Sequence, residues 1–409
     1  MLKPSKSTIL LLMAWAFFSC QAQTGQEPTT APSESQEEEV GMVEEPIIPA
    51  AERMEAYRSE LEGKRMAVVA NQTSLVGDTH LVDTLLALGM DIAHVFAPEH
   101  GFRGMADAGA QISDETDAKT GLPIYSLYGK NKKPSSEQME GLDLVLFDIQ
   151  DVGVRCYTYL STLHYIMEAA AESGVPVMVL DRPNPNGSYV DGPMMEEEQM
   201  SFVGLHPVPL VYGMTIGEYA RMIQGEGWID DAENLHLDVV PCGGYTHDRT
   251  YELPVPPSPN LPNVASIVLY PSLVLFEGTV VSVGRGTEYP FQVVGHPDYP
   301  FGSFTFQPKS GPGAKHPKLE GERCQGLSLE AYDAEERSLR LDWLLDFHAQ
   351  ISGGEEAFFL ENLFFDKLAG NTRLREQISR GVPESDIRAS WAESLESFKE
   401  VRDKYLMYP

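Results

Sequence analysis

The stretch from Leu144 to Tyr159, LVLFDIQDVGVRCYTY, decides the fold and points to a binding site. Its first four residues are all apolar, which is the pattern of a strand buried on both faces of a parallel sheet. The chain then becomes polar through two acids, an amide, an arginine and two tyrosines. Ligands of open α/β sheets bind in the crevice at the carboxyl ends of the strands. We therefore expect a strand that runs into one wall of a site.

A purely structural interpretation of the same stretch is the alternative. The two acids, Asp148 and Asp151, could cap the helix that the sequence predicts from Ser161 to Ser173. They could also form an internal ion pair with Arg155. The stretch alone favours neither interpretation.

Three further predicted strands are each followed by a polar loop. The strands are Arg65–Ala70, Asp91–Ala97 and Val175–Leu180, and the loops after them read NQTS, PEHGFRG and DRPNPNG. A helix is predicted from Thr79 to Leu88. Strands that alternate with helices predict a doubly wound parallel sheet, the Rossmann-like class of α/β fold. Because parallel strands point the same way, all four polar loops should lie at one edge of this sheet.

The N-terminal segments of the 409-residue chain have the composition of an export signal and a spacer. Residues 1–20 contain two lysines, a short apolar run and then Ser19-Cys20, which predicts a signal peptide of the lipoprotein type with lipid attached to Cys20. Simple secretion with cleavage nearby is the alternative. Residues 21–50 are rich in Pro, Ser, Thr, Gln and Glu and predict a disordered acidic linker. The body would then be exported, to the periplasm or the outer membrane of a bacterium.

The body divides into two expected domains. Residues 51–250 form the Rossmann-like α/β domain, with a further helix at Thr215–Gln224 and a strand at Leu235–Val240. Residues 251–409 read as a smaller α+β domain, which contains proline-rich and glycine-rich stretches and short alternating segments. Its two longest helices are expected at Leu339–Gln350 and Ala389–Tyr405.

Charge and cysteine content exclude several classes of function. The net charge of −31 argues against nucleic acid, whose phosphates must be neutralised by clustered Lys and Arg. No Walker loop is present and no GxGxxG follows a strand, so we expect no nucleotide cofactor. The cysteines of the body, Cys156, Cys242 and Cys324, are odd in number and include no CxxC pair. They predict buried free thiols, with one disulfide as the alternative, and no zinc site.

The loop PEHGFRG supplies the first candidate for catalysis. Glu99 directly follows a strand and has His100 and Arg103 close by in the sequence. A carboxyl group in this position suits general acid or base catalysis, particularly if Phe102 desolvates it and raises its pKa. The alternative is a Glu99–Arg103 ion pair that only fixes the loop.

Two other stretches offer acids next to arginines. Asp148 and Asp151, with Gln150 and Arg155, provide the two carboxylates that glycoside hydrolysis requires, although the same acids could hold a divalent metal. Glu277 lies in FEGT, and GRGT places a glycine on each side of Arg285, which leaves that side chain free to meet a ligand. An ordinary glycine-rich turn is the alternative for GRGT.

A series of motifs, in order along the chain, carries a resemblance to a known family. They are FAPEHGFRG (Phe96–Gly104), TGLPIYSLYG (Thr120–Gly129), FDIQDVGVRCYTY (Phe147–Tyr159), LDRPNPNG (Leu180–Gly187), SFVG (Ser201–Gly204), YGMTIGEYA (Tyr212–Ala220), PPSPNLP (Pro256–Pro262), FEGT (Phe276–Thr279) and GRGT (Gly284–Thr287). The sequence resembles the exo-β-N-acetylmuramidases of peptidoglycan recycling from about residue 60 to its end. The resemblance implies a Rossmann-like domain joined to a smaller domain, with the active cleft between them. It also implies release of N-acetylmuramic acid from the non-reducing end of peptidoglycan-derived muramyl saccharides, without a cofactor.

This implied chemistry assigns roles to the candidate residues. Glu99 would be the general acid, and Asp148 or Asp151 the partner carboxylate, with Glu277 as its rival. An arginine suits the lactyl carboxylate of muramic acid, and the candidates are Arg103, Arg155 and Arg285. Tyr157 and Tyr159 could supply a flat face for the sugar ring, and the remaining expected contacts are Asn71, His100, Gln150 and Asn184.

Three alternatives stay open at this point. The acetamido group of the substrate could replace the nucleophile. The protein could be a non-catalytic lipoprotein that binds cell-wall fragments. It could also be a metal-dependent hydrolase of an amide or ester.

Overall fold

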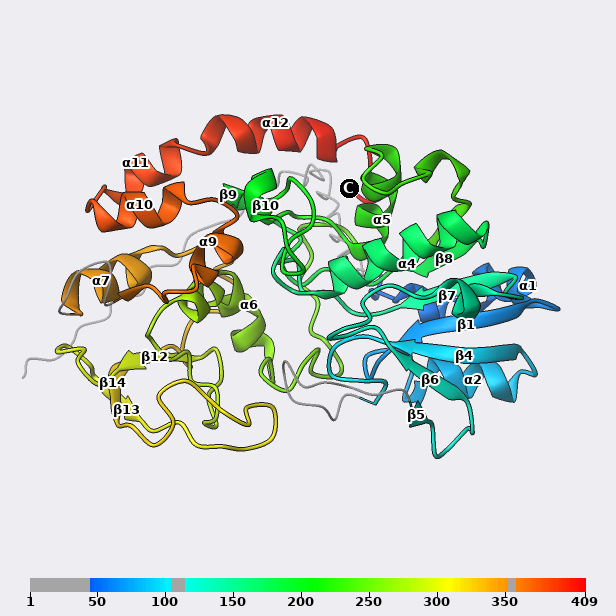
Figure 1. The fold of residues 1–409 in the computed structure, drawn as a ribbon, viewed down its shortest axis with the longest axis horizontal. Coiled ribbons are helices and arrows are strands. Elements are labelled where there is room, and N and C mark those ends of the chain that lie inside the picture. Colours follow the sequence, from blue (N-terminus) through cyan, green and yellow to red (C-terminus); the bar gives the residue numbers. More distant parts are fainter. Residues whose placement is uncertain (1–44, 104–114, 352–357) are drawn as a thin grey trace, which may run out of the picture. The chain divides into compact units, whose positions relative to one another are not determined.

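A seven-stranded sheet organises the computed structural model, which describes residues 45–103, 115–351 and 358–409 (Figure 1). The strand order is β11-β8-β7-β1-β4-β6-β5. Six strands are parallel, and short β5 pairs antiparallel with β6. In chain order the parallel strands are arranged 3-2-1-4-5-6, which is the order of a Rossmann sheet. The strand bounds are Arg65–Ala70 for β1, Asp91–Ala97 for β4, Glu115–Thr116 for β5, Pro123–Ser126 for β6, Leu144–Asp148 for β7, Val177–Leu180 for β8 and Leu237–Val240 for β11.

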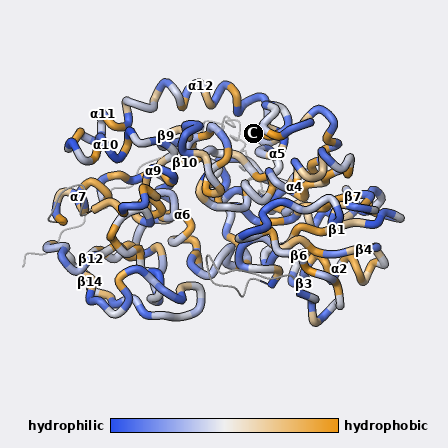
Figure 2. Tube along the Cα trace, in the orientation of Figure 1, coloured by the Kyte–Doolittle hydropathy of each residue, from blue (hydrophilic) through white to orange (hydrophobic). Residues whose placement is uncertain are grey.

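The continuous apolar runs of the central strands follow from burial on both faces of the sheet (Figure 2). In β7, Val145 and Phe147 belong to one core cluster, whereas Leu144 and Leu146 belong to the other. The first cluster includes the inner sides of α4 (Tyr159–Ser173) and α5 (Ile216–Gly225). The second includes α1 (Arg58–Leu61) and α2 (Leu81–Ala87). Helices therefore cover both faces of the sheet, as the predicted doubly wound fold requires.

Several element bounds differ from the sequence-based expectation at their N-terminal ends. β1 and β4 have the predicted bounds. The helix expected from Thr79 instead begins at Leu81, because Thr79–His80 forms β3 and pairs with β2 (Leu75–Val76). The ring of His80 then accepts a hydrogen bond from the Val82 amide and caps α2. Local strand pairing thus replaced the first helical turn.

The region after residue 250 is an α+β arrangement, as expected. It begins with α6 (Val264–Leu273) and the 3₁₀ helix η5 (Val274–Gly278). A three-stranded antiparallel sheet follows, in the order β12-β14-β13, built from Val293–His296, Cys324–Ser328 and Phe304–Phe306. The remaining helices are α7 (Asp342–Gln350), α9 (Phe364–Ala369), α10 (Arg373–Ser379), α11 (Glu384–Ala389) and α12 (Ala392–Arg402). The helix expected from Ala389 to Tyr405 is thus α12 alone, since α11 ends at Ala389.

Contacts join residues 45–409 into one unit, and the division expected at residue 250 stays a prediction. Residues just before the expected start at 51 already pack on the body, since Ile48 forms a β-bridge with Gly243 and Ala50 is fully buried. The expected signal peptide, Cys20 and the linker up to residue 44 lie outside the described residues. Within the described part of the chain, no helix has both the length and the apolar character needed to cross a membrane.

An ion pair between Asp148 and Arg182 clamps the carboxyl edge of the sheet. Asp148 ends β7 and Arg182 follows β8, with Nε–Oδ1 and Nη2–Oδ2 distances of 2.6 and 2.9 Å. Asp148 is 0% and Arg182 3% exposed. Arg182 also donates to the carbonyl of Leu75, so the pair connects the ends of β7 and β8 with the loop after β1.

We expect Asp148→Asn to destabilise the protein strongly, because it leaves the buried guanidinium without its counter-charge. Breaking a buried pair in this way costs about 3–5 kcal/mol of unfolding free energy. Denaturant unfolding followed by circular dichroism measures the loss. The matched control is Asp91→Asn, whose pair with Arg65 is more than half exposed on both sides and should contribute at most about 1 kcal/mol. Equal losses for the two variants would contradict the assignment.

Candidate active site

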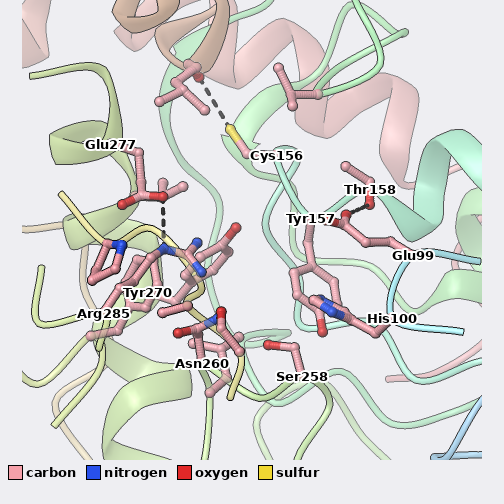
Figure 3. A pocket seen from close by; sticks show the side chains of 18 of the residues that line it. Glu99, His100, Cys156, Tyr157, Thr158, Ser258, Asn260, Tyr270, Glu277 and Arg285 are labelled. Atoms are coloured by element: carbon pink, nitrogen blue, oxygen red, sulfur yellow. Dashed lines mark hydrogen bonds and ion pairs between the residues drawn. The ribbon is translucent and has the colours of Figure 1, made fainter. Parts of the chain in front are cut away.

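A cavity of about 820 Å³ lies at the carboxyl edge of the sheet (Figure 3). One wall comes from the Rossmann-like part: Glu99 and His100 after β4, Tyr128 after β6, and residues 156–159, which lead from the loop after β7 into α4. The facing wall comes from residues after 250, namely α6, η5, the turn at Arg285 and residues 313–318. The cavity is thus built jointly by the two parts of the body.

Glu99 is fixed on the first wall by a hydroxyl and a sharp turn. Its Oε2 accepts a hydrogen bond from Thr158 Oγ1 at 2.9 Å. His100 and Gly101 have φ angles of 72° and 77°, and two successive left-handed residues turn the chain directly after the acid. Burial, together with the charge of Glu99 and a hydrogen bond to it, raises the pKa of Tyr128 well above its usual value. Tyr128 is therefore a neutral hydroxyl beside the carboxylate.

Glu277 lies on the facing wall and is paired with Arg285. Arg285 Nε donates to Glu277 Oε2 at 2.9 Å, and the two side chains are 25% and 22% exposed. Gly284 and Gly286 flank the arginine with φ angles of 81° and 77°, so this turn requires both glycines. The Arg285 guanidinium also lies over the ring of Phe291, 4.9 Å from its centroid. The predicted freedom of Arg285 is thus limited by one ion pair and one ring.

Figure 3 shows Glu99 and Glu277 on opposite sides of the cavity, with Tyr157 between them. The ring of Tyr157 meets those of Tyr159 and Tyr270 edge to face, at centroid distances of 4.8 and 5.9 Å. Burial raises the pKa of Tyr157 well above its usual value, so its hydroxyl stays protonated. All three tyrosines line the cavity, although they are at most 8% exposed, and a flat face for the sugar ring stays a prediction.

Cys156 also lines the cavity, but its chemistry is that of a buried thiol. Burial raises its pKa to about 11, and its Sγ donates to the carbonyl of Leu368. A neutral thiol is a poor nucleophile. Cys242 and Cys324 are likewise free and buried, which confirms the prediction of buried free thiols.

The two aspartates expected to partner Glu99 do not line the cavity. Asp148 is held inside the sheet edge by Arg182. Asp151 is 3% exposed and accepts hydrogen bonds from the Tyr212 hydroxyl and from the Gly153 amide. Burial raises the pKa of Asp151 to about 7. Both acids belong to the buried strand ends and loop bases that support the cavity, which we call the frame. The rival candidate Glu277 is the carboxylate that faces Glu99.

Arg155 is another expected site residue that the structure places in the core. It is 2% exposed, and its guanidinium donates to the carbonyls of Pro193, Val208 and Leu368 at 2.7 to 3.0 Å. The alternative, a pair with an acid of its own loop, is not formed, and Arg155 does not line the cavity. Its neighbour Gln150 donates to the carbonyls of Asp151 and Pro183 and also supports the loops from below.

Arg103 lies outside the cavity, and its partners are acids other than Glu99. It donates to Asp117 at 2.8 Å and to Asp83 at 3.5 Å, so the alternative of a Glu99–Arg103 pair is also wrong. Phe102, which was expected to desolvate Glu99, is buried and packs against His80 and Arg103 instead.

Asn71 and Asn184, which were expected to contact the substrate, form hydrogen bonds within the protein instead. Asn71 Oδ1 accepts from the amide and hydroxyl of Thr73. Asn184 donates to the carbonyl of Met214 and accepts from the Asn186 amide. Neither lines the cavity.

The sequence analysis missed several residues of the cavity. Thr158, Tyr128, Ser258 and Asn260 stand inside motifs that were recognised, so attention to their hydroxyl and amide groups could have identified them. Lys318 lies outside every motif, and no sequence signal pointed to it. In the part of the chain that the structure describes, no three His, Cys, Asp or Glu side chains gather as metal ligands would.

Comparison with known proteins agrees along almost the whole body. The family models "Exo-beta-N-acetylmuramidase NamZ, N-terminal" and "C-terminal" match residues 66–265 and 268–408. The peptidoglycan beta-N-acetylmuramidase NamZ of Bacillus subtilis is 39% identical over 386 residues, which cover 86% of this chain and 89% of that protein.

Solved structures show the same fold. Two DUF1343 family proteins of Bacteroides fragilis superpose with TM-scores of 0.82 and 0.77, at 43% and 29% identity. Each comparison covers 89% of this chain and 99% of the other. Since both family models match and together span most of the sequence, the chain belongs to the exo-beta-N-acetylmuramidase NamZ family and is a glycoside hydrolase.

Proposed function

We propose that this protein releases N-acetylmuramic acid from the non-reducing end of peptidoglycan fragments, with Glu99 and Glu277 as its paired carboxylates. The observation that carries the proposal is the position of these two acids on facing walls of one cavity. Most glycosidases use two carboxyl groups that flank the scissile bond. A sugar held between the walls would meet one acid on each side.

The surroundings of the two glutamates suggest different roles. Glu99 Oε2 is engaged by a neutral hydroxyl donor, Thr158, and Glu99 is assigned as the general acid. It protonates the glycosidic oxygen as the bond from that oxygen to the anomeric carbon breaks. Glu277 is held by the guanidinium of Arg285. It faces the sugar ring of the substrate as a carboxylate and stabilises the positive charge of the oxocarbenium-like transition state. Water then attacks the anomeric carbon, and its proton goes to the Glu99 carboxylate, which restores the acid.

Arg285 is assigned to the lactyl carboxylate of muramic acid. Only its Nε is used by Glu277, and its Nη groups make no hydrogen bond to any residue that the structure describes. A guanidinium binds a carboxylate through two parallel hydrogen bonds. N-Acetylglucosamine lacks the lactyl group, so this contact would make the site selective for muramic acid.

Glu99→Gln should separate the general acid from its partner. We expect kcat on a MurNAc–GlcNAc disaccharide to fall about 10²- to 10⁴-fold. The loss on an aryl β-N-acetylmuramide should be much smaller, because the phenolate of a phenol with a low pKa can leave without being protonated. Glu277→Gln should lose activity on both substrates, since the charge it stabilises forms in each reaction. Release of the phenol and of the reducing sugar measures the two reactions.

The exposed Glu320→Gln variant serves as the control and should match the wild type. Equal losses of Glu99→Gln on both substrates would contradict its role as general acid. A chelator that abolishes wild-type release would favour a metal-dependent hydrolase. Binding of intact fragments without any release would leave a cell-wall receptor.

Arg285→Met should weaken binding of the product N-acetylmuramic acid while leaving that of N-acetylglucosamine unchanged. A hydrogen bond to a charged group is worth about 1.5–3 kcal/mol, so the inhibition constant of the muramic acid should rise roughly 10- to 100-fold. Amidation of the lactyl carboxyl should weaken inhibition of the wild type but not of Arg285→Met. A variant that still distinguishes the acid from its amide would refute the contact.

We also infer that the protein is exported and tethered through a lipid on Cys20, with residues 21–44 as spacer. The support is the lysine-containing apolar N-terminus that ends at Ser19-Cys20. Cells supplied with labelled palmitate should label the wild type, whereas Cys20→Ser should carry no label and leave the membrane fraction. An unlabelled wild type would show simple secretion instead.

A further inference from the structure

Lys318 places an ammonium group among main-chain carbonyls at the edge of the cavity. Its Nζ donates to the carbonyl oxygens of Phe276, Glu277 and Val281 at 2.9, 3.4 and 3.1 Å, and also to that of Thr279. Burial lowers the pKa of Lys318 to about 8, so the amine is still largely protonated at neutral pH. No carboxylate of the described residues forms an ion pair with it. Its hydrogen bonds to the described residues all go to main-chain carbonyls, while the charge of Glu277 raises its pKa and that of Arg285 lowers it.

These carbonyls belong to the segment that carries Glu277. The 3₁₀ helix η5 ends at Gly278, and the last carbonyls of a helix lack partners inside it. Of the four carbonyls, those of Phe276 and Glu277 belong to η5, and that of Phe276 also accepts from the Thr279 amide and hydroxyl. A cation at this end of η5 interacts favourably with its carbonyl dipoles. Lys318 therefore holds the main chain on both sides of Glu277, whereas Arg285 holds only its carboxylate.

The segment that bears Lys318 also packs against the turn of Arg285. The Lys309 amide donates to the carbonyl of Gly286 at 2.9 Å. A Cβ on Gly286 would lie 2.4 Å from the Lys309 carbonyl oxygen and 2.7 Å from Pro317 Cγ, so the two segments are in close contact. Residues 313–318 then line the cavity beside Glu277 and Arg285. The Lys318 side chain is the point where this segment is joined to η5.

We propose that Lys318 is a positioning residue for Glu277, which fixes residues 276–281 so that the carboxylate faces Glu99 across the cavity. The inference rests on the proposed function, in which Glu277 is the partner carboxylate. Lys318 lines the cavity, but its hydrogen bonds to the described residues go to main chain only, and it is assigned no part in proton transfer. Its loss would let the Glu277 segment move without removing any reacting group.

The first test replaces the ammonium and keeps the side chain's length. Lys318→Met should lower kcat about 100-fold, because a displacement of about 1 Å can cost that much, with a smaller change in KM. Amide hydrogen exchange should accelerate in residues 276–281, while the sheet strands keep their protection. The exposed Lys309→Met is the matched control and should change neither quantity. Unchanged exchange and kcat in Lys318→Met would overturn the proposal.

Chemical rescue distinguishes the charge from simple packing. Propylammonium added to Lys318→Ala should restore much of kcat, and 1-propanol, which has similar size and no charge, should not. Equal rescue by both compounds would overturn the role of the ammonium. Should Lys318→Met fail to fold, Lys318→Arg is the alternative variant. It keeps the positive charge but places a planar guanidinium, in place of the compact ammonium, among the carbonyls. It should then retain KM and lose kcat, and full activity would count against the proposal.

A double-mutant cycle separates this inference from the proposed function. Adding Lys318→Met to Glu277→Gln should cause little further loss, because both changes act through the same carboxylate. Wild-type activity in Glu277→Gln would refute the catalytic role of Glu277, while the exchange measurement would still report on Lys318. An inactive Glu277→Gln, together with additive losses in the double variant, would refute the positioning role alone.

Discussion

Parallel alignment of the strands is the constraint on which the site depends. Because β1, β4, β6, β7 and β8 point the same way, the loops that follow them all emerge at one edge of the sheet. Charged side chains gathered there need partners if they are buried. The Asp148–Arg182 pair meets this need and ties the ends of two strands together. The loop that presents Glu99 rests on the edge that this pair stabilises.

Burial separates the acids and arginines of this edge into two groups. Asp148, Asp151 and Arg155 are at most 3% exposed, and their polar atoms bind other parts of the frame. Glu99 and Arg285 are partly exposed to the cavity and keep atoms that a substrate could reach. A buried charged group forms its hydrogen bonds with other atoms of the protein, so few donors or acceptors remain for a ligand. Among these five residues exposure, and not residue type, separates frame from site, but exposure alone is insufficient: the Arg103 side chain is 35% exposed and lies outside the cavity.

The sequence predicted the sheet well, because a strand buried on both faces has an apolar run that little else imitates. Convergence of the loops after parallel strands predicted that Glu99 and Tyr157 would lie at one edge of the sheet, whereas the family resemblance alone implied that Arg285 would face the same cleft. It could not predict that Asp148 turns towards Arg182, because the direction of a side chain at a strand end depends on neighbours distant in sequence. Lys318 was missed for the same reason, since its partners lie 37 to 42 residues earlier in the chain.

The two halves of the cavity hold their acids by different means. Glu99 sits on a loop that directly continues β4, whereas Glu277 sits on a single 3₁₀ turn, which has little rigidity of its own. Contacts from outside must supply that rigidity. A Cβ on Gly278 would lie 2.4 Å from Phe365 Cα, so α9 presses against the turn from one side, and the ammonium of Lys318 binds its carbonyls from another. In the proposed mechanism the stereochemical course depends on the separation of the two carboxylates. These contacts on the main chain, together with Thr158 on Glu99 and Arg285 on Glu277, would set that separation.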